Sequence, residues 1–139
     1  MFSARYALWI ASGIAAASLA GCATTSNLAN SSERLERSAF ALEDEARDEN
    51  VSSNYQRDAQ ELAREARDFR RVLKDRGTDD DDVREAFEDL SKRYHAVRDE
   101  TERARNSELD AEFKDVTEAY LDIEREMTRH DDRDRVARD

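Results

Sequence analysis

The sequence predicts an all-α protein, an antiparallel four-helix bundle built from two helical hairpins. After a short apolar N-terminal segment the chain has no proline and a single glycine, Gly77, so local propensity favours helix with few interruptions. Apolar residues then recur at spacings of three and four, as expected for helices with one buried face. Breaks in this spacing divide the pattern into four stripes, and short connections make neighbouring helices antiparallel.

Each stripe predicts one helix. The stripes comprise Leu35, Ala39, Leu42 and Ala46; then Val51, Tyr55, Ala59, Leu62, Ala66, Phe69 and Leu73; then Val83, Phe87, Leu90, Tyr94, Val97, Thr101 and Ala104; and finally Leu109, Phe113, Val116, Tyr120, Ile123 and Met127. The first two stripes are rich in alanine and the last two in aromatic residues. We therefore expect large side chains to pack over small ones in interdigitating layers.

Two five-residue steps, from Ala46 to Val51 and from Ala104 to Leu109, cannot continue a spacing of three or four and therefore predict turns. Residues that favour turns and helix caps surround them, namely Asn50, Ser52 and Ser53 at the first step and Asn106 and Ser107 at the second. Ser107 and Asp110 are spaced as a variant of the capping box. An alternative passes one or both steps through a continuous helix and gives long rods that pair with another chain.

Gly77 predicts the boundary between the two hairpins, as a left-handed residue closing the second helix. Thr78 and the run Asp79 to Asp82 then supply capping groups and negative charge at the start of the third helix, which the helix dipole favours. The same acidic run is a weak candidate for binding calcium, but it lacks the alternating ligands and central glycine of an EF-hand.

The third and fourth helices echo each other. Phe87, Leu90, Tyr94 and Val97 are matched 26 residues later by Phe113, Val116, Tyr120 and Ile123. Internal duplication and simple selection for a helical core both explain the echo.

Opposite charges occupy many positions outside the stripes. The acidic-first i,i+4 pairs are Glu33–Arg37, Glu43–Arg47, Glu88–Lys92, Asp89–Arg93 and Asp99–Arg103. They predict a solvated face with weak stabilising pairs, and the stripes themselves carry no Asp or Glu.

Residues 1–23 carry the most specific motif. Arg5 is the only charge ahead of an apolar stretch from Tyr6 to Ala17, which is too short to span a bilayer and is followed by Leu19-Ala20-Gly21-Cys22. This segment resembles a bacterial lipoprotein signal peptide. The resemblance implies cleavage before Cys22, lipidation of that residue and, because Ala23 rather than Asp follows it, sorting to the periplasmic face of the outer membrane. The alternatives are an unlipidated secretory peptide and an apolar N-terminal anchor.

Cleavage divides the chain into a signal peptide (residues 1–21), a lipidated polar tether (22–30), the bundle (31–129) and a charged tail (130–139) that either extends the last helix or stays disordered. The mature chain has 118 residues, and loss of Arg5 lowers its formal net charge from −11 to −12. This acidity argues against binding nucleic acid or anionic lipid through charge. With Cys22 as the only cysteine, the chain forms no internal disulfide.

The residues expected for cofactors or catalysis are sparse. Four-helix bundles often hold metals or haem, but His95 and His130 have no ligand partner at a suitable spacing, so neither cofactor nor metal is expected. No nucleophile–base arrangement is visible, which predicts a non-enzymatic protein.

We therefore expect a lipid-anchored structural or protein-interaction module whose partner is another cell-envelope protein. The alternative is a periplasmic stress chaperone or a weak divalent-cation-binding protein. No family resemblance is evident beyond residue 23.

Overall fold

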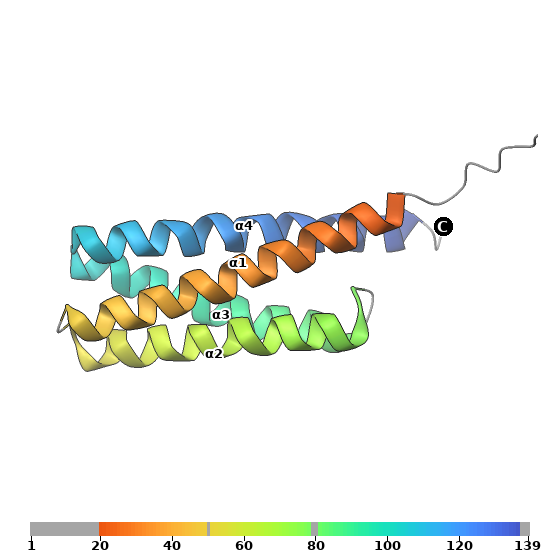
Figure 1. Ribbon diagram of the computed structural model, residues 1–139. Coiled ribbons are helices and arrows are strands. Elements are labelled where there is room, and N and C mark those ends of the chain that lie inside the picture. The colour runs from red at the N-terminus through yellow and green to blue at the C-terminus, as the bar shows by residue number, and fades with distance from the viewer. Residues whose placement is uncertain (1–19, 50, 79–80, 137–139) are drawn as a thin grey trace, which may run out of the picture.

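The chain folds into four helices, α1 (Ala20–Asp48), α2 (Ser53–Arg76), α3 (Asp81–Ala104) and α4 (Ser107–Val136). The computed structural model describes residues 20–49, 51–78 and 81–136, with the backbone alone for residues 20–26, 131 and 133–135. Successive helices run in opposite directions (Figure 1). The predicted all-α antiparallel bundle is confirmed, and both five-residue steps are turns rather than continuous helix.

Different helix ends and connections lie at the two ends of the bundle (Figure 1). The start of α1, the α2–α3 connection and the end of α4 lie at one end, which we call the proximal end. The α1–α2 and α3–α4 connections lie at the other, the distal end. α1 packs closely on α2 and α4, and α2 packs on α3, whereas no described residues of α2 and α4 have Cα atoms within 8 Å of each other. These two helices therefore occupy opposite corners.

The predicted stripes form the core. Almost all of their members are buried; Val51 and Phe87 are half-buried, and Ala104 is exposed because α3 ends there. The core also includes three residues that lie outside the predicted stripes, Leu28, Ala63 and Ala119.

Side-chain size sets the spacing between helices. Ala39, Ala46, Ala59 and Ala66 are fully buried, and their small side chains allow the close approach of α1 and α2. α3 and α4 approach closely at few points, because aromatic rings fill the space between them. The expectation that large side chains pack over small ones is therefore wrong for this interface, where the large ones pack on each other.

The echo between α3 and α4 corresponds to a local two-fold arrangement. The rings of Tyr94 and Tyr120 stack at its centre, with centroids 3.9 Å apart and planes 9° apart. Phe87 stacks on Tyr120 at 6.0 Å, and Phe113 stacks on Tyr94 at 5.5 Å. Since the helices are antiparallel, the phenylalanine of each meets the tyrosine of the other.

Hydroxyl groups follow the same symmetry. Tyr94 donates its hydroxyl proton to Oγ1 of Thr117 over 3.2 Å, and the hydroxyls of Tyr120 and Ser91 share a hydrogen bond of 2.7 Å. Ser91 and Thr117 are themselves 26 residues apart, so the echo extends to polar positions that hydrophobic spacing did not reveal.

Caps define two helix starts. The backbone N–H of Tyr55 donates to the Ser52 hydroxyl at 3.2 Å, as expected for a cap of α2. The cap of α4 is Asn106, whose Oδ1 accepts from the N–H groups of Glu108 and Leu109 at 2.9 and 3.3 Å. The capping role predicted for Ser107 is wrong, because Ser107 is already the first helical residue.

Gly77 ends α2 as predicted, and its N–H donates to the Leu73 carbonyl at 3.0 Å. Its φ of 85° is positive, but its ψ of −179° places it in an extended region open essentially to glycine alone, rather than in the left-handed helical region. Asp81 and Asp82 lie in the first turn of α3, while Asp79 and Asp80 fall outside the described residues.

Helix extends into the segments predicted as tether and tail. α1 begins at Ala20, so the proposed tether at residues 22–30 is helix, and Leu28 is already fully buried. α4 continues to Val136, so the described part of the tail extends the last helix. Polar composition alone suggested a tether, but α1 is held in the bundle by its packing on α2 and α4.

Ion pairs cover the surface, but mostly not at the predicted i,i+4 spacing. Glu43 and Arg47 pair as expected. Lys92 instead pairs with Asp89, three residues away, at 2.8 Å. Arg103 pairs with Glu100 at 2.5 Å, and Arg93 reaches across to Glu61 on α2 at 2.5 Å. Neighbouring helices thus offer partners that the sequence spacing does not show.

Candidate interaction surface

The proposed lipidation site lies at the proximal end. Cys22 is in the first turn of α1, two residues after the helix begins, and its side chain falls outside the described positions. Residues 1–19 of the signal segment are also outside the described chain. Among the described helices, no stretch is long and apolar enough to cross a bilayer.

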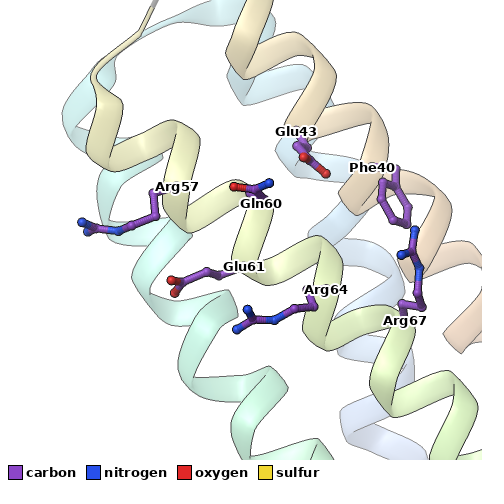
Figure 2. A pocket seen from close by; sticks show the side chains of 7 residues that line it. All are labelled: Phe40, Glu43, Arg57, Gln60, Glu61, Arg64 and Arg67. Atoms are coloured by element: carbon purple, nitrogen blue, oxygen red, sulfur yellow. The ribbon is translucent and has the colours of Figure 1, made fainter.

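A groove of about 420 Å³ runs between α1 and α2. Figure 2 shows Phe40 and Glu43 on the α1 wall, facing residues of α2. Arg67 reaches across the groove and places its guanidinium 4.5 Å from the centre of the Phe40 ring, a cation–π contact. Arg57 and Arg64 extend from α2 away from α1 (Figure 2).

The acidic side chains of the groove have stronger ion-pair partners than two of its arginines. Its two acidic residues already have strong partners, because Glu43 pairs with Arg47 and Glu61 pairs with Arg93 at 2.5 Å. Among the described residues, the carboxylates that Arg57 and Arg64 contact are those next to them in the chain, Asp58 at 3.4 Å and Glu65 at 3.2 Å. Both arginine side chains are exposed by about 60% and remain open to an external anion.

Two acidic residues are buried at the edge of the core, although the stripes contain none. Glu43 and Glu126 are only 6% and 8% exposed. Glu43 pairs with Arg47, and Glu126 accepts a hydrogen bond from Arg129 at 2.5 Å. Each carboxylate is compensated within its own helix, which suits a structural ion pair.

Three carboxylates converge at the distal end. Oxygens of Glu45, Glu49 and Glu108 lie within 4.8 Å of one another. Asn106 donates to Glu49 Oε2 at 2.9 Å; this bond, followed by one from Glu108, lowers the pKa of Glu49. The hydrogen bond to Glu49 and the charges of Glu49 and Glu45 raise the pKa of Glu108. Protonation of Glu108 would therefore relieve the repulsion between these neighbouring carboxylates.

Two buried tyrosines are stabilised as neutral phenols. Burial raises the pKa of Tyr55, and its 3.0 Å hydrogen bond with Thr101 only partly offsets this effect. Burial likewise raises the pKa of Tyr120, which bonds to Ser91. Neither phenol is poised to ionise near neutral pH, so both serve packing.

The remaining candidate ligands are dispersed. His95 is exposed on α3 with its ring edge against Tyr94, and His130 is half-buried on α4. Asp81 pairs with Arg84 at 3.0 Å, and Asp82 contacts Arg76 at 3.6 Å. These contacts favour a structural role for the described part of the acidic run.

Sequence reasoning missed the groove and its arginines, because hydrophobic spacing locates only the buried face of each helix. Counting charge helix by helix would have given a signal: α2 carries seven basic and five acidic residues within an acidic chain. Comparison with protein-family models, curated protein sequences and solved structures finds no match to this chain.

Proposed function

We propose that the protein is a lipoprotein of the outer membrane, anchored through Cys22 on the periplasmic face, and that it acts as a non-catalytic module presenting charged helical surfaces to other envelope proteins. The observation that carries this proposal is the Leu19-Ala20-Gly21-Cys22 motif after a short apolar segment. Attachment of two or more acyl chains would make the anchoring stable, since each buried methylene contributes roughly 0.8 kcal/mol.

The position of Cys22 in the fold supports a stiff attachment. Helix begins at Ala20 and Leu28 is buried, so only a few helical residues separate the proposed lipid from the packed bundle. Eight residues of helix span about 12 Å, compared with roughly 28 Å for an extended tether. The proximal end would therefore stay close to the bilayer, with α2 and α4 both running toward it.

The surface supports an interaction role. The groove between α1 and α2 combines an aromatic side chain with arginines that lack strong partners, as protein-binding surfaces often do. The buried carboxylates are paired with arginines, and in the distal cluster Glu49 accepts a hydrogen bond from Asn106. These arrangements favour binding over catalysis.

The test is mass spectrometry of the mature N-terminus together with membrane fractionation. We expect an acylated peptide beginning at Cys22, and release of the Cys22→Ser variant from the outer-membrane fraction. Ala23→Ser is the matched control and should remain acylated and membrane-bound. An unmodified N-terminal peptide in the wild type, or an unchanged membrane fraction for Cys22→Ser, would refute the anchoring.

A further inference from the structure

Charge is distributed unevenly around the bundle. α2 has two more basic than acidic residues, whereas the first eighteen residues of α4 contain seven acidic residues and one basic residue, Lys114. α2 and α4 occupy opposite corners, since α1 packs on both of them and no described residues of α2 and α4 have Cα atoms within 8 Å of each other. The molecule therefore carries opposite charge on two opposite sides.

On α2, exposed cations recur at heptad spacing. Arg57, Arg64 and Arg71 are seven residues apart, and Arg67 and Lys74 form a second row beside them. We call these five residues the basic stripe. The groove between α1 and α2 runs beside it (Figure 2), and its acidic residues are already paired within the chain.

On α4, four exposed carboxylates lie in the first half of the helix, and one of them, Glu108, belongs to the distal cluster. Asp110, Asp115 and Glu118, which we call the acidic stripe, form no ion pair within the part of the chain that the structure describes. The next acid, Asp122, is already bound by Arg34 at 2.5 Å and Arg125 at 2.8 Å. The acidic stripe therefore keeps its charge available for an outside cation.

The two stripes also lie at the same height. Both helices begin at the distal end and run toward the proximal end (Figure 1). Arg64 and Glu118 are each eleven residues beyond the first residue of their helix, about 17 Å along the axis. Copies attached to one membrane by the same end stand the same way up, so α2 of one copy and α4 of its neighbour would be parallel and level.

We infer that membrane-anchored copies of this chain associate side by side, the basic stripe and α1–α2 groove of one copy receiving the acidic stripe of the next. This contact joins two different surfaces and does not close on itself, so it extends into a row. The inference rests on the proposed anchoring, which supplies common orientation and high local concentration. Free bundles repel through their net charge, and exposed ion pairs are weak and screened by salt beyond roughly 8 Å at physiological ionic strength.

The test uses the full acylated chain in vesicles of zwitterionic phospholipid. Gln60 and Lys114 each lie seven residues into α2 and α4 and are exposed, so the Gln60→Cys and Lys114→Cys changes place thiols at matching heights. A short thiol cross-linker should give a ladder of dimers, trimers and longer species. Each single-cysteine variant should give none, whereas a two-fold symmetric dimer would cross-link with one cysteine alone.

Charge reversal in the two-cysteine background tests the contact itself. Arg57→Glu with Arg64→Glu, or Asp115→Lys with Glu118→Lys, should each reduce cross-linking roughly tenfold, because attraction between exposed charges becomes repulsion. Mixing the two reversed proteins should restore the ladder, since each then offers the other a complementary surface. Restoration also shows that both variants are folded.

Matched changes on α3 control for net charge. Lys92→Glu with Arg103→Glu shifts the net charge as the α2 reversal does, and should leave the ladder unchanged. Membrane association is measured on every sample first: protein absent from the vesicles contradicts the anchoring, whereas anchored protein that stays monomeric overturns the row alone. A further outcome is that the protein is anchored but monomeric, and that Arg57→Glu with Arg64→Glu changes only its binding to anionic vesicles. This outcome would also overturn the row, and would assign the basic stripe to the lipid surface.

Discussion

Replacing Tyr94 by alanine should be among the most damaging single changes in this bundle. The side chain is 5% exposed, and its ring stacks on both Tyr120 and Phe113. Truncation of a large buried aromatic side chain costs about 3–5 kcal/mol, since apolar contacts are lost and a cavity remains. A domain of this size is stable by only about 5–15 kcal/mol, so Tyr94→Ala removes a large share of the total.

The matched variant Tyr94→Phe separates ring packing from hydrogen bonding. It keeps the stacking and loses only the 3.2 Å hydrogen bond to Thr117, worth about 0.5–1.5 kcal/mol. At roughly 4 °C per kcal/mol, the expected fall in Tm is about 4 °C for Tyr94→Phe and about 16 °C for Tyr94→Ala.

Far-ultraviolet circular dichroism measures both variants in thermal and urea unfolding. An unchanged dependence of the unfolding free energy on urea would show that the folded state stays equally compact. If Tyr94→Ala were no more destabilising than Tyr94→Phe, the stacked rings would not hold α3 and α4 together, and the account of their wide spacing would fail.

Three further outcomes are expected. Ala23→Asp should move the acylated protein from the outer to the inner membrane in density-gradient fractionation, as the resemblance to lipoproteins implies; an unchanged distribution would contradict that sorting. Gly77→Ala should lower the unfolding free energy by about 1–3 kcal/mol, because the backbone region that Gly77 occupies is open essentially to glycine and is strained for alanine. The new methyl group itself would meet no neighbouring atom within 4 Å. An unchanged urea midpoint would show that the α2–α3 connection relaxes. Because the pKa of Glu108 is raised, the stability contributed by its proton is present at low pH and lost as pH rises through that pKa. Glu108→Gln should therefore raise Tm at pH 7 and have little effect below pH 4.5, the ordinary pKa of this group. Equal effects at both pH values would contradict the raised pKa.

The sequence predicted the fold well, because helical periodicity states directly which residues lie on a buried face. The stripe Leu35, Ala39, Leu42 and Ala46 is fully buried. Ala104 belongs to a predicted stripe but is exposed. Periodicity predicts which face of a helix a residue lies on, but not the residue at which the helix ends. Residues 22–30 form helix despite their polar composition, and Leu28 is buried in the core.

The surface was harder to predict for a related reason. Arg93 has a helical partner available in Asp89, yet it pairs with Glu61 on another helix. The charge of α2 can be counted from sequence, but its place opposite α4 follows from how four helices associate. Only the structure shows that Arg64 and Glu118 lie on opposite sides at equal height.

The stacked pair Tyr94 and Tyr120 has a spectroscopic consequence. The only tryptophan of the chain, Trp9, lies in the proposed signal peptide, so the processed protein would emit fluorescence from tyrosine alone. Its three tyrosines, Tyr55, Tyr94 and Tyr120, are all buried. Indole emission would then report unprocessed precursor, while the near-ultraviolet dichroism of the two nearly parallel phenol rings would follow docking of α3 on α4, with no dye or label attached.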